Sequence, residues 1–179
     1  FSTLADDPTS STAREGVVLQ AEQLTRAFHD LASEFDAITR GADTAIVSGV
    51  DEINQLASEV AQLNEAILAN GSDVESLRDR REVAVSRLSE LAGVSVIRTS
   101  NGNIDLTLGS GRPLVVGVST FAVSVTQNAS GLATVMSGGF DITGELSGGR
   151  LGGLIHLRDA VIPDYRARLD QLAYDVATA

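Results

Sequence analysis

Apolar side chains recur at a seven-residue spacing in the first part of the chain, which predicts a long amphipathic helix. Two rows of them are offset by four positions, as expected for one helix face. The rows are Val17, Leu24, Leu31, Ile38 and Ala45, and Ala21, Phe28, Phe35 and Ala42. Thr12 and Glu15 match a capping box, so we expect the helix to begin at this point. Its apolar face is suited to packing against partner helices.

The spacing resumes one position late after Gly41 and Gly49. The later row is Ile46, Ile53, Val60 and Ile67. A one-residue slip beside glycines is either absorbed as a local distortion or marks a break between two helices. We expect one long helix over residues 12–69, distorted between Gly41 and Gly49, and two helices remain the alternative.

A second helix is expected over residues 73–92. The dipeptide Asn70-Gly71 supplies a stop for the first helix, and Ser72 with Glu75 forms a second capping box. The chain therefore turns back on itself at this point.

From Val94 the apolar period changes to two, which predicts antiparallel β-structure. Asn101-Gly102 between two alternating runs is a strong hairpin signal. Further β-rich runs follow at residues 114–118 and 121–126, with a weaker one at 132–136. Together they predict a small antiparallel β unit.

A glycine-rich stretch over residues 138–153 leads into a helix at about 151–161, and Pro163 begins another. The fold class is α+β, mainly α: an elongated antiparallel helical bundle with a small antiparallel β subdomain. The expected domains are the long N-terminal helices at 1–93, the β subdomain at 94–147 and the returning C-terminal helices at 148–179.

Composition narrows the chemistry. The 179 residues include 24 acidic and 13 basic side chains, for a net charge of −11, and no cysteine. The missing cysteines exclude disulfide scaffolds, thiol nucleophiles and cysteine-ligated metal sites. Every basic residue is arginine, so Schiff-base lysines are excluded too. We expect no nucleic-acid partner, because the acidic excess repels phosphates, and no membrane insertion, because the apolar runs are short.

No constellation of residues predicts catalysis. The only histidines, His29 and His156, lie in predicted helices, and only Asp159 stands near either at metal-ligand spacing. A hydrolase or metal-dependent enzyme using His156 and Asp159 is the alternative reading. There is no G-x-S-x-G motif for a serine hydrolase. We therefore expect no enzyme activity, no catalytic, cofactor-binding or metal-binding residues, and no cofactor.

Three further features of the sequence have structural interpretations. The glycines at 148–153 resemble a phosphate-binding loop but lack its lysine, so a tight turn and close helix packing are favoured. Arg81 flanks an apolar stripe, and we expect it to pair with a carboxylate at a helix interface. Asn64 continues the row of Val50 and Ala57 and is expected to fix helix register.

Four blocks of sequence resemble the flagellar hook-associated protein 1 family, FlgK. They cover most of the chain, and the last is the most specific. The blocks are FSTL at 1–4 with Asp7-Pro8, Ala13-Arg14, Val17-Val18, Ala21, Leu24 and Phe28; VDEINQLA at 50–57 with VAQLN at 60–64 and Ile67; LRDRRE at 77–82 with Leu88, Leu91, Gly93-Val94 and GRPLVVG at 111–117; and GGRLGGLIHLRD at 148–159 with LDQLA at 169–173. Arg78 departs mildly from the family pattern, in which a second leucine is usual.

The resemblance implies a structural adaptor at the hook–filament junction of the bacterial flagellum. It implies contacts with the hook protein and the next junction protein, and self-assembly into a ring or tube layer. It also implies an export chaperone for the full-length chain, secretion through the flagellar type III apparatus and an extracellular location.

The chain opens without Met and stops at Ala179 within a helical pattern. We therefore expect an internal fragment that lacks the terminal segments and is monomeric alone. Another secreted coiled-coil assembly, flagellin-like or an adhesin module, is the alternative to the junction role.

Overall fold

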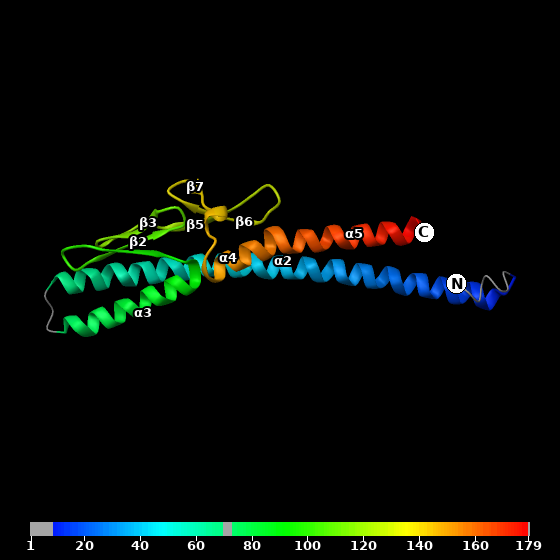
Figure 1. The fold of residues 1–179 in the computed structure, drawn as a ribbon, viewed down its shortest axis with the longest axis horizontal. Coiled ribbons are helices and arrows are strands. Elements are labelled where there is room, and N and C mark those ends of the chain that lie inside the picture. Colours follow the sequence, from blue (N-terminus) through cyan, green and yellow to red (C-terminus); the bar gives the residue numbers. More distant parts are fainter. Residues whose placement is uncertain (1–8, 70–72, 179) are drawn as a thin grey trace. The chain divides into compact units, whose positions relative to one another are not determined.

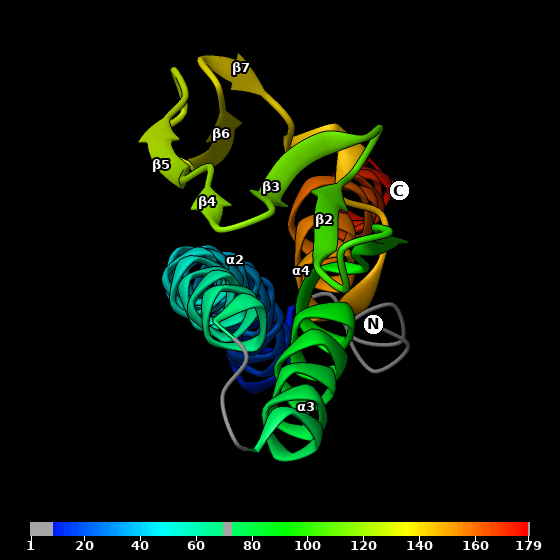
Figure 2. The same ribbon diagram turned by 90° about the vertical axis from the view of Figure 1, so that its left-hand side faces the viewer.

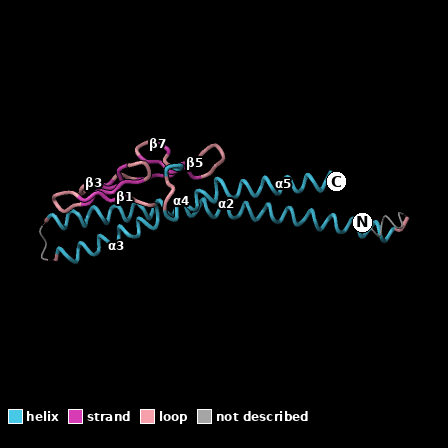
Figure 3. Tube along the Cα trace, viewed as in Figure 1, coloured by secondary structure: helices cyan, strands magenta, loops and turns pink. Residues whose placement is uncertain are grey.

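The computed structural model describes residues 9–69 and 73–178, and most of them are helical (Figures 1 and 3). Four α-helices are present in this part of the chain: α2 (Ser11–Leu68), α3 (Val74–Ala92), α4 (Gly149–His156) and α5 (Ile162–Thr178). Seven short strands lie between α3 and α4. The predicted α+β, mainly α class, with antiparallel helices and antiparallel sheets, is confirmed.

The chain divides into two compact units. One combines the residues up to Thr39 with those from Ile162 onward, and the other is Arg40–Val161. The boundary falls inside α2, so each unit contains part of that helix. The sequence-based division at residues 93 and 147 stays a prediction.

The start of α2 differs from the predicted capping box. Ser10 Oγ accepts the Ala13 N–H at 3.2 Å, so the cap lies at Ser10 rather than at Thr12. The helix continues through Gly41 and Gly49, and the two-helix alternative is therefore wrong. Gly49 is buried, and a Cβ there would collide with Leu151 of α4, so its role is close packing.

Helix α3 ends at Gly93, which adopts the left-handed conformation (φ 59°) and donates its N–H to Ser89 O at 3.0 Å. The predicted stop at Asn70-Gly71 and the Ser72 cap lie outside the described residues.

The first sheet confirms the predicted hairpin. Its strand order is β1-β2-β3-β4, all antiparallel. The strands are β1 (Ser95–Arg98), β2 (Ile104–Leu108), β3 (Arg112–Val116) and β4 (Ser119–Thr120). Gly102 in the β1–β2 turn has φ 88°, a conformation that favours glycine. β1 is an edge strand.

The remaining strands form a second, separate antiparallel sheet, ordered β5-β6-β7. They are β5 (Val123–Gln127), β6 (Ala133–Ser137) and β7 (Phe140–Asp141), followed by the 3₁₀ turn η1 (Thr143–Glu145). The single β unit expected from sequence is therefore two sheets. Both lie on one side of α2 and α3 (Figures 1 and 2).

One hydrophobic core joins these elements of the unit Arg40–Val161. It combines side chains from α2, α3, α4 and both sheets. Its largest fully buried members are Ile46, Ile53, Leu88, Leu106, Leu108, Leu114, Ile142 and Leu151. The later heptad row of α2 thus faces strands as well as helices.

A π-helical segment, η2 (Leu157–Val161), connects α4 to α5. The predicted new start at Pro163 is close to the beginning of α5 at Ile162. Proline cannot donate a backbone hydrogen bond. The π-helical segment, which ends two residues before Pro163, changes the local pattern of backbone hydrogen bonds. The chain therefore stays helical from Gly149 to Thr178.

The other unit pairs the first part of α2 with α5, and the two run antiparallel (Figure 1). The rings of Phe35 and Tyr165 are 6.3 Å apart, and Arg166 pairs with Asp36. In the described residues of this unit only Ile162 is buried. The rest of its apolar side chains are at least partly exposed.

Among residues 9–69 and 73–178, no helix combines the length and apolar character that crossing a membrane requires.

Candidate functional site

Three polar side chains of α2 bind the backbone at the start of a strand. They are Asp43, Asn54 and Asn64, and they reach the first residues of β6, β5 and β2 respectively. Asp43 and Asn54 lie about three helical turns apart, which places both on the same face. One helix thus fixes the position of both sheets in the unit Arg40–Val161.

Asn54 forms a two-way contact with Val123. Its Nδ2 donates to Val123 O at 2.7 Å, and its Oδ1 accepts the Val123 N–H at 2.9 Å. The side-chain amide therefore reproduces the pairing that a neighbouring strand would supply.

Asn64 also binds strand backbone, through more hydrogen bonds than Asn54 makes, and it is fully buried. Its Nδ2 donates to Ile104 O at 2.8 Å and to Gly117 O at 2.6 Å, while its Oδ1 accepts the Ile104 N–H at 3.3 Å. The Oδ1 also accepts from Arg81 Nη1 at 2.8 Å. Asn64 therefore aligns strands, and its bond with Arg81 also joins α2 to α3; a role in fixing helix register stays a prediction.

Arg81 is 7% exposed and donates from Nη1 to Asn64 Oδ1 and to Gly102 O at 3.0 Å. The expected carboxylate partner is absent from the described residues, so that prediction is wrong. Burial lowers the pKa of the Arg81 guanidinium, and the charges of Arg78 and Arg98 lower it further. Its Nε is buried and has no hydrogen-bond partner among residues 9–69 and 73–178.

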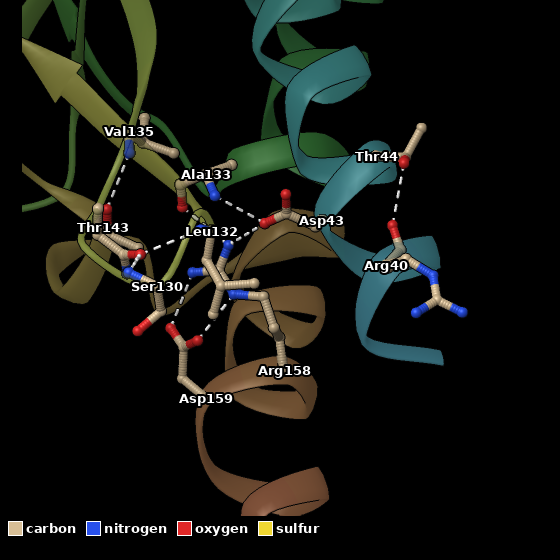
Figure 4. A network of polar contacts seen from close by, with 11 residues as sticks. Arg40, Asp43, Thr44, Ser130, Leu132, Ala133, Val135, Thr143, Arg158 and Asp159 are labelled. Atoms are coloured by element: carbon tan, nitrogen blue, oxygen red, sulfur yellow. Dashed lines mark hydrogen bonds and ion pairs between the residues drawn. The ribbon is translucent and has the colours of Figure 1, made fainter. Parts of the chain in front are cut away.

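Arg158, in the π-segment η2, is the centre of a second network (Figure 4). Its side chain is 2% exposed. Nη1 donates to Asp43 Oδ1 at 2.6 Å and to Ala133 O at 2.8 Å, and Nε and Nη2 form a fork on Asp159 at 2.7 and 3.0 Å. Hydrogen bonding to Asp159 raises the pKa of Arg158 despite its burial.

Asp43 completes this network from the α2 side. The same Oδ1 that pairs with Arg158 accepts the Ala133 N–H at 2.8 Å. Both backbone groups of Ala133 are therefore bonded to charged side chains, from two different helical segments. This arrangement attaches β6 to α2 and η2 and has no obvious chemical reactivity.

The residues weighed for catalysis are not brought together. His156 is exposed, and the Asp159 carboxylate is occupied by Arg158. His29 lies in the other unit. In the described part of the chain, no three His, Asp or Glu side chains are placed to share a metal ion.

Two glycines of the stretch at 148–153, Gly149 and Gly152, serve close packing, as favoured from sequence. Gly149 has φ 66°, and a Cβ there would lie 2.6 Å from Ala92 N. A Cβ on Gly152 would meet Ser147 C at 2.5 Å. Next to them, Arg150 forms an exposed ion pair with Glu52 of α2 at 2.8 Å.

The unit containing α5 carries an open groove of about 470 Å³, lined mainly by apolar residues. Its walls come from both helices of that unit. They include Ala21, Leu24, Phe28 and Ala32 of α2 and Leu169, Ala173 and Val176 of α5. Leu24 and Val176 are 43% and 49% exposed. Part of the face predicted to pack on partner helices therefore lines this groove together with α5.

Comparison with known proteins connects this architecture to one family. The model of the flagellar hook-associated protein FlgK helical domain matches residues 1–179. The chain belongs to the FlgK helical-domain family. Flagellar hook-associated protein 1 of Salmonella typhimurium is 30% identical over 188 residues, which span 98% of this chain and 34% of that protein. The Escherichia coli K12 protein of the same name is 28% identical over the same shares.

A solved FlgK structure has the same fold. The flagellar hook junction protein FlgK from Burkholderia pseudomallei superposes with a TM-score of 0.77 at 30% identity, covering 88% of this chain and 30% of that one. The chain spans about a third of the length of the curated relatives it matches.

Proposed function

We propose that this chain is a structural segment of a hook-associated protein at the junction between the flagellar hook and filament. The family match over residues 1–179 carries this proposal, because the matching relatives are named hook-associated and hook junction proteins. The segment catalyses no reaction. Its buried arginines and asparagines serve to position strands.

The partners in this proposal are the hook protein on one side and the next junction protein on the other. In the intact protein, copies self-assemble into a ring or tube layer, and a chaperone accompanies export through the flagellar apparatus to the cell exterior. Repeated contacts of this kind require two different faces on each subunit.

The groove between the first part of α2 and α5 supports an assembly role. Its apolar side chains are exposed on a helix pair that buries little surface of its own. Apolar surface of this kind is stabilised when a further helix covers it. The segment alone is monomeric in dilute solution, with assembly driven by the remainder of the protein; a stable oligomer in sedimentation experiments would contradict this point.

Complementation tests the junction role. The hook-associated protein 1 gene is deleted from a motile strain, and the deletion strain is complemented with the full-length gene, with or without this segment. We expect hooks without filaments, and filament protein in the medium, when the gene is absent. Normal filaments on the deletion strain would reject the role and favour the other secreted coiled-coil assemblies.

The groove is tested in the same strain by Leu24→Asp combined with Val176→Asp. We expect filament attachment to be lost, because two charges would enter an apolar contact. Leu19→Asp is the matched control, since Leu19 is 56% exposed on the same helix and is not part of the groove. Attachment lost equally in the control would refute a specific role for the groove.

A further inference from the structure

A second groove, of about 430 Å³, lies between α3 and the edge strand β1, within the unit Arg40–Val161. Arg81 and Val85 line it from α3, and Val96 and Arg98 line it from β1. Val96 and Arg98 are two positions apart, so they share the face of the sheet that meets α3. The groove therefore offers both apolar and cationic contacts to one ligand.

The β1 strand has a free edge. It is the first strand in the sheet order, and all four of its residues are exposed, with Val96 at 40% and Ile97 at 54%. An exposed edge presents unpaired backbone donors and acceptors that an extended peptide can pair with.

The two arginines of the groove retain unused hydrogen-bonding capacity. Arg81 is more than nine-tenths buried, and toward the described part of the chain it donates only from Nη1 and leaves Nε without a partner. The Arg98 guanidinium forms no ion pair within residues 9–69 and 73–178. Glu82 lines the groove as well but pairs with neither in this part of the chain. The Nε–Nη2 edge of an arginine is suited to a two-point contact with a carboxylate.

We propose that the α3–β1 groove binds an extended acidic peptide segment, which adds to the β1 edge and places a carboxylate on Arg81 and Arg98. The apolar neighbours of the acidic residue pack on Val85 and Val96. Charge complementarity favours an acidic ligand: burial and the charges of Arg78 and Arg98 lower the pKa of Arg81, and a carboxylate beside Arg81 and Arg98 offsets the repulsion between the guanidinium groups. This site is independent of the α2–α5 groove and of the junction role.

Peptide titration of the 179-residue chain, labelled with ¹⁵N, tests the proposal. The probe is the N-acetylated, C-amidated pentapeptide TVEVT, and its matched control is TVQVT. We expect TVEVT to shift the backbone amides of Ser95–Arg98 and the Nε–Hε signal of Arg81. TVQVT should bind at least about tenfold more weakly, because it lacks the charge-assisted hydrogen bonds.

A pair of variants separates the groove from general charge attraction. Arg98→Gln should weaken TVEVT binding by at least about tenfold, and it leaves the buried contacts of Arg81 intact. Arg80→Gln removes the same charge from an exposed position of α3 outside the groove and should leave binding unchanged.

Four results of the peptide titrations would overturn the proposal. They are equal binding of both peptides, equal weakening by Arg98→Gln and Arg80→Gln, shifts confined to other surfaces, and no saturable shift at the highest soluble peptide concentration. Amide shifts of β1 that grow with protein concentration in the absence of peptide would identify a second copy as the occupant and would also reject the acidic peptide.

Discussion

The Asn54 side chain pairs with both backbone groups of Val123, donating at 2.7 Å and accepting at 2.9 Å. These residues are 69 positions apart in sequence. Because β5 begins at Val123, the contact fixes where the second sheet starts relative to α2. A helix residue thus performs the pairing that a strand would otherwise provide.

Replacing Asn54 by Ala should destabilise the protein by about 1–2 kcal/mol, because two partly buried backbone groups lose their partner. The free energy of unfolding in urea measures this loss. Gln55→Ala is the matched control, since Gln55 is exposed on the same helix turn. Equal stability of the two variants would show that the Asn54–Val123 contact contributes nothing.

Arg158→Met should cost about 3 kcal/mol of stability. The change leaves Ala133 O without its donor and Asp43 without its cation, in a site where the Arg158 side chain is 2% exposed. Arg150→Met removes an exposed pair with Glu52 and should cost less than about 1 kcal/mol. Chemical denaturation of both variants gives the comparison, and a loss at Arg158 no larger than at Arg150 would contradict this assignment.

The helices were predictable from sequence because their signal is local. Seven-residue spacing predicted α2, and a change to a two-residue period predicted the β1–β2 hairpin around Gly102. The cap was placed at Thr12 and not Ser10 because several adjacent hydroxyl residues satisfy the same capping rule. Such boundaries depend on which hydroxyl the backbone reaches.

The polar contacts could not be assigned in the same way, because their partners are backbone groups far away in sequence. Asn64 was singled out as a polar residue in an apolar row, yet Ile104 and Gly117 gave no signal of their own. Asp43 and Arg158 were missed, although Arg158 lies within the family-like block at 148–159. The only local indication of these contacts is a charged residue beside an apolar row, as with Asp43 next to Ala42.

Gly149→Ala should destabilise the protein by about 3 kcal/mol or more. Its φ of 66° disfavours alanine, and the new Cβ would lie 2.6 Å from Ala92 N in the backbone of α3. Gly153→Ala in the same helix has open space around it, so it should be neutral or stabilising by up to about 1 kcal/mol. Thermal denaturation distinguishes the two, and similar melting temperatures would contradict the close approach of α4 to α3.

Hydrogen bonds from the Thr143 side chain and backbone N–H lower the pKa of the Asp141 carboxyl. A lowered folded-state pKa contributes stability above the ordinary aspartate pKa of about 3.9, and this contribution is lost as pH falls through the folded-state value. NMR titration of the Asp141 carboxyl carbon should therefore give a higher midpoint in Thr143→Val. Thr143→Ser retains the hydroxyl and should keep the low midpoint; an unchanged midpoint in Thr143→Val would rule out the side-chain contribution.

Hydrogen exchange should differ between the two units. In the described residues the unit containing α5 buries only Ile162, whereas α2 beyond Arg40 contributes many fully buried side chains. Local opening costs less free energy where fewer apolar contacts are broken. Backbone amides in the second half of α5 should therefore exchange faster than those between Ile46 and Asn64 in native-state exchange measured by NMR. Equal protection in both regions would mean that the exposed α2–α5 face is already covered in solution, and a concentration series would then show whether a second copy covers it.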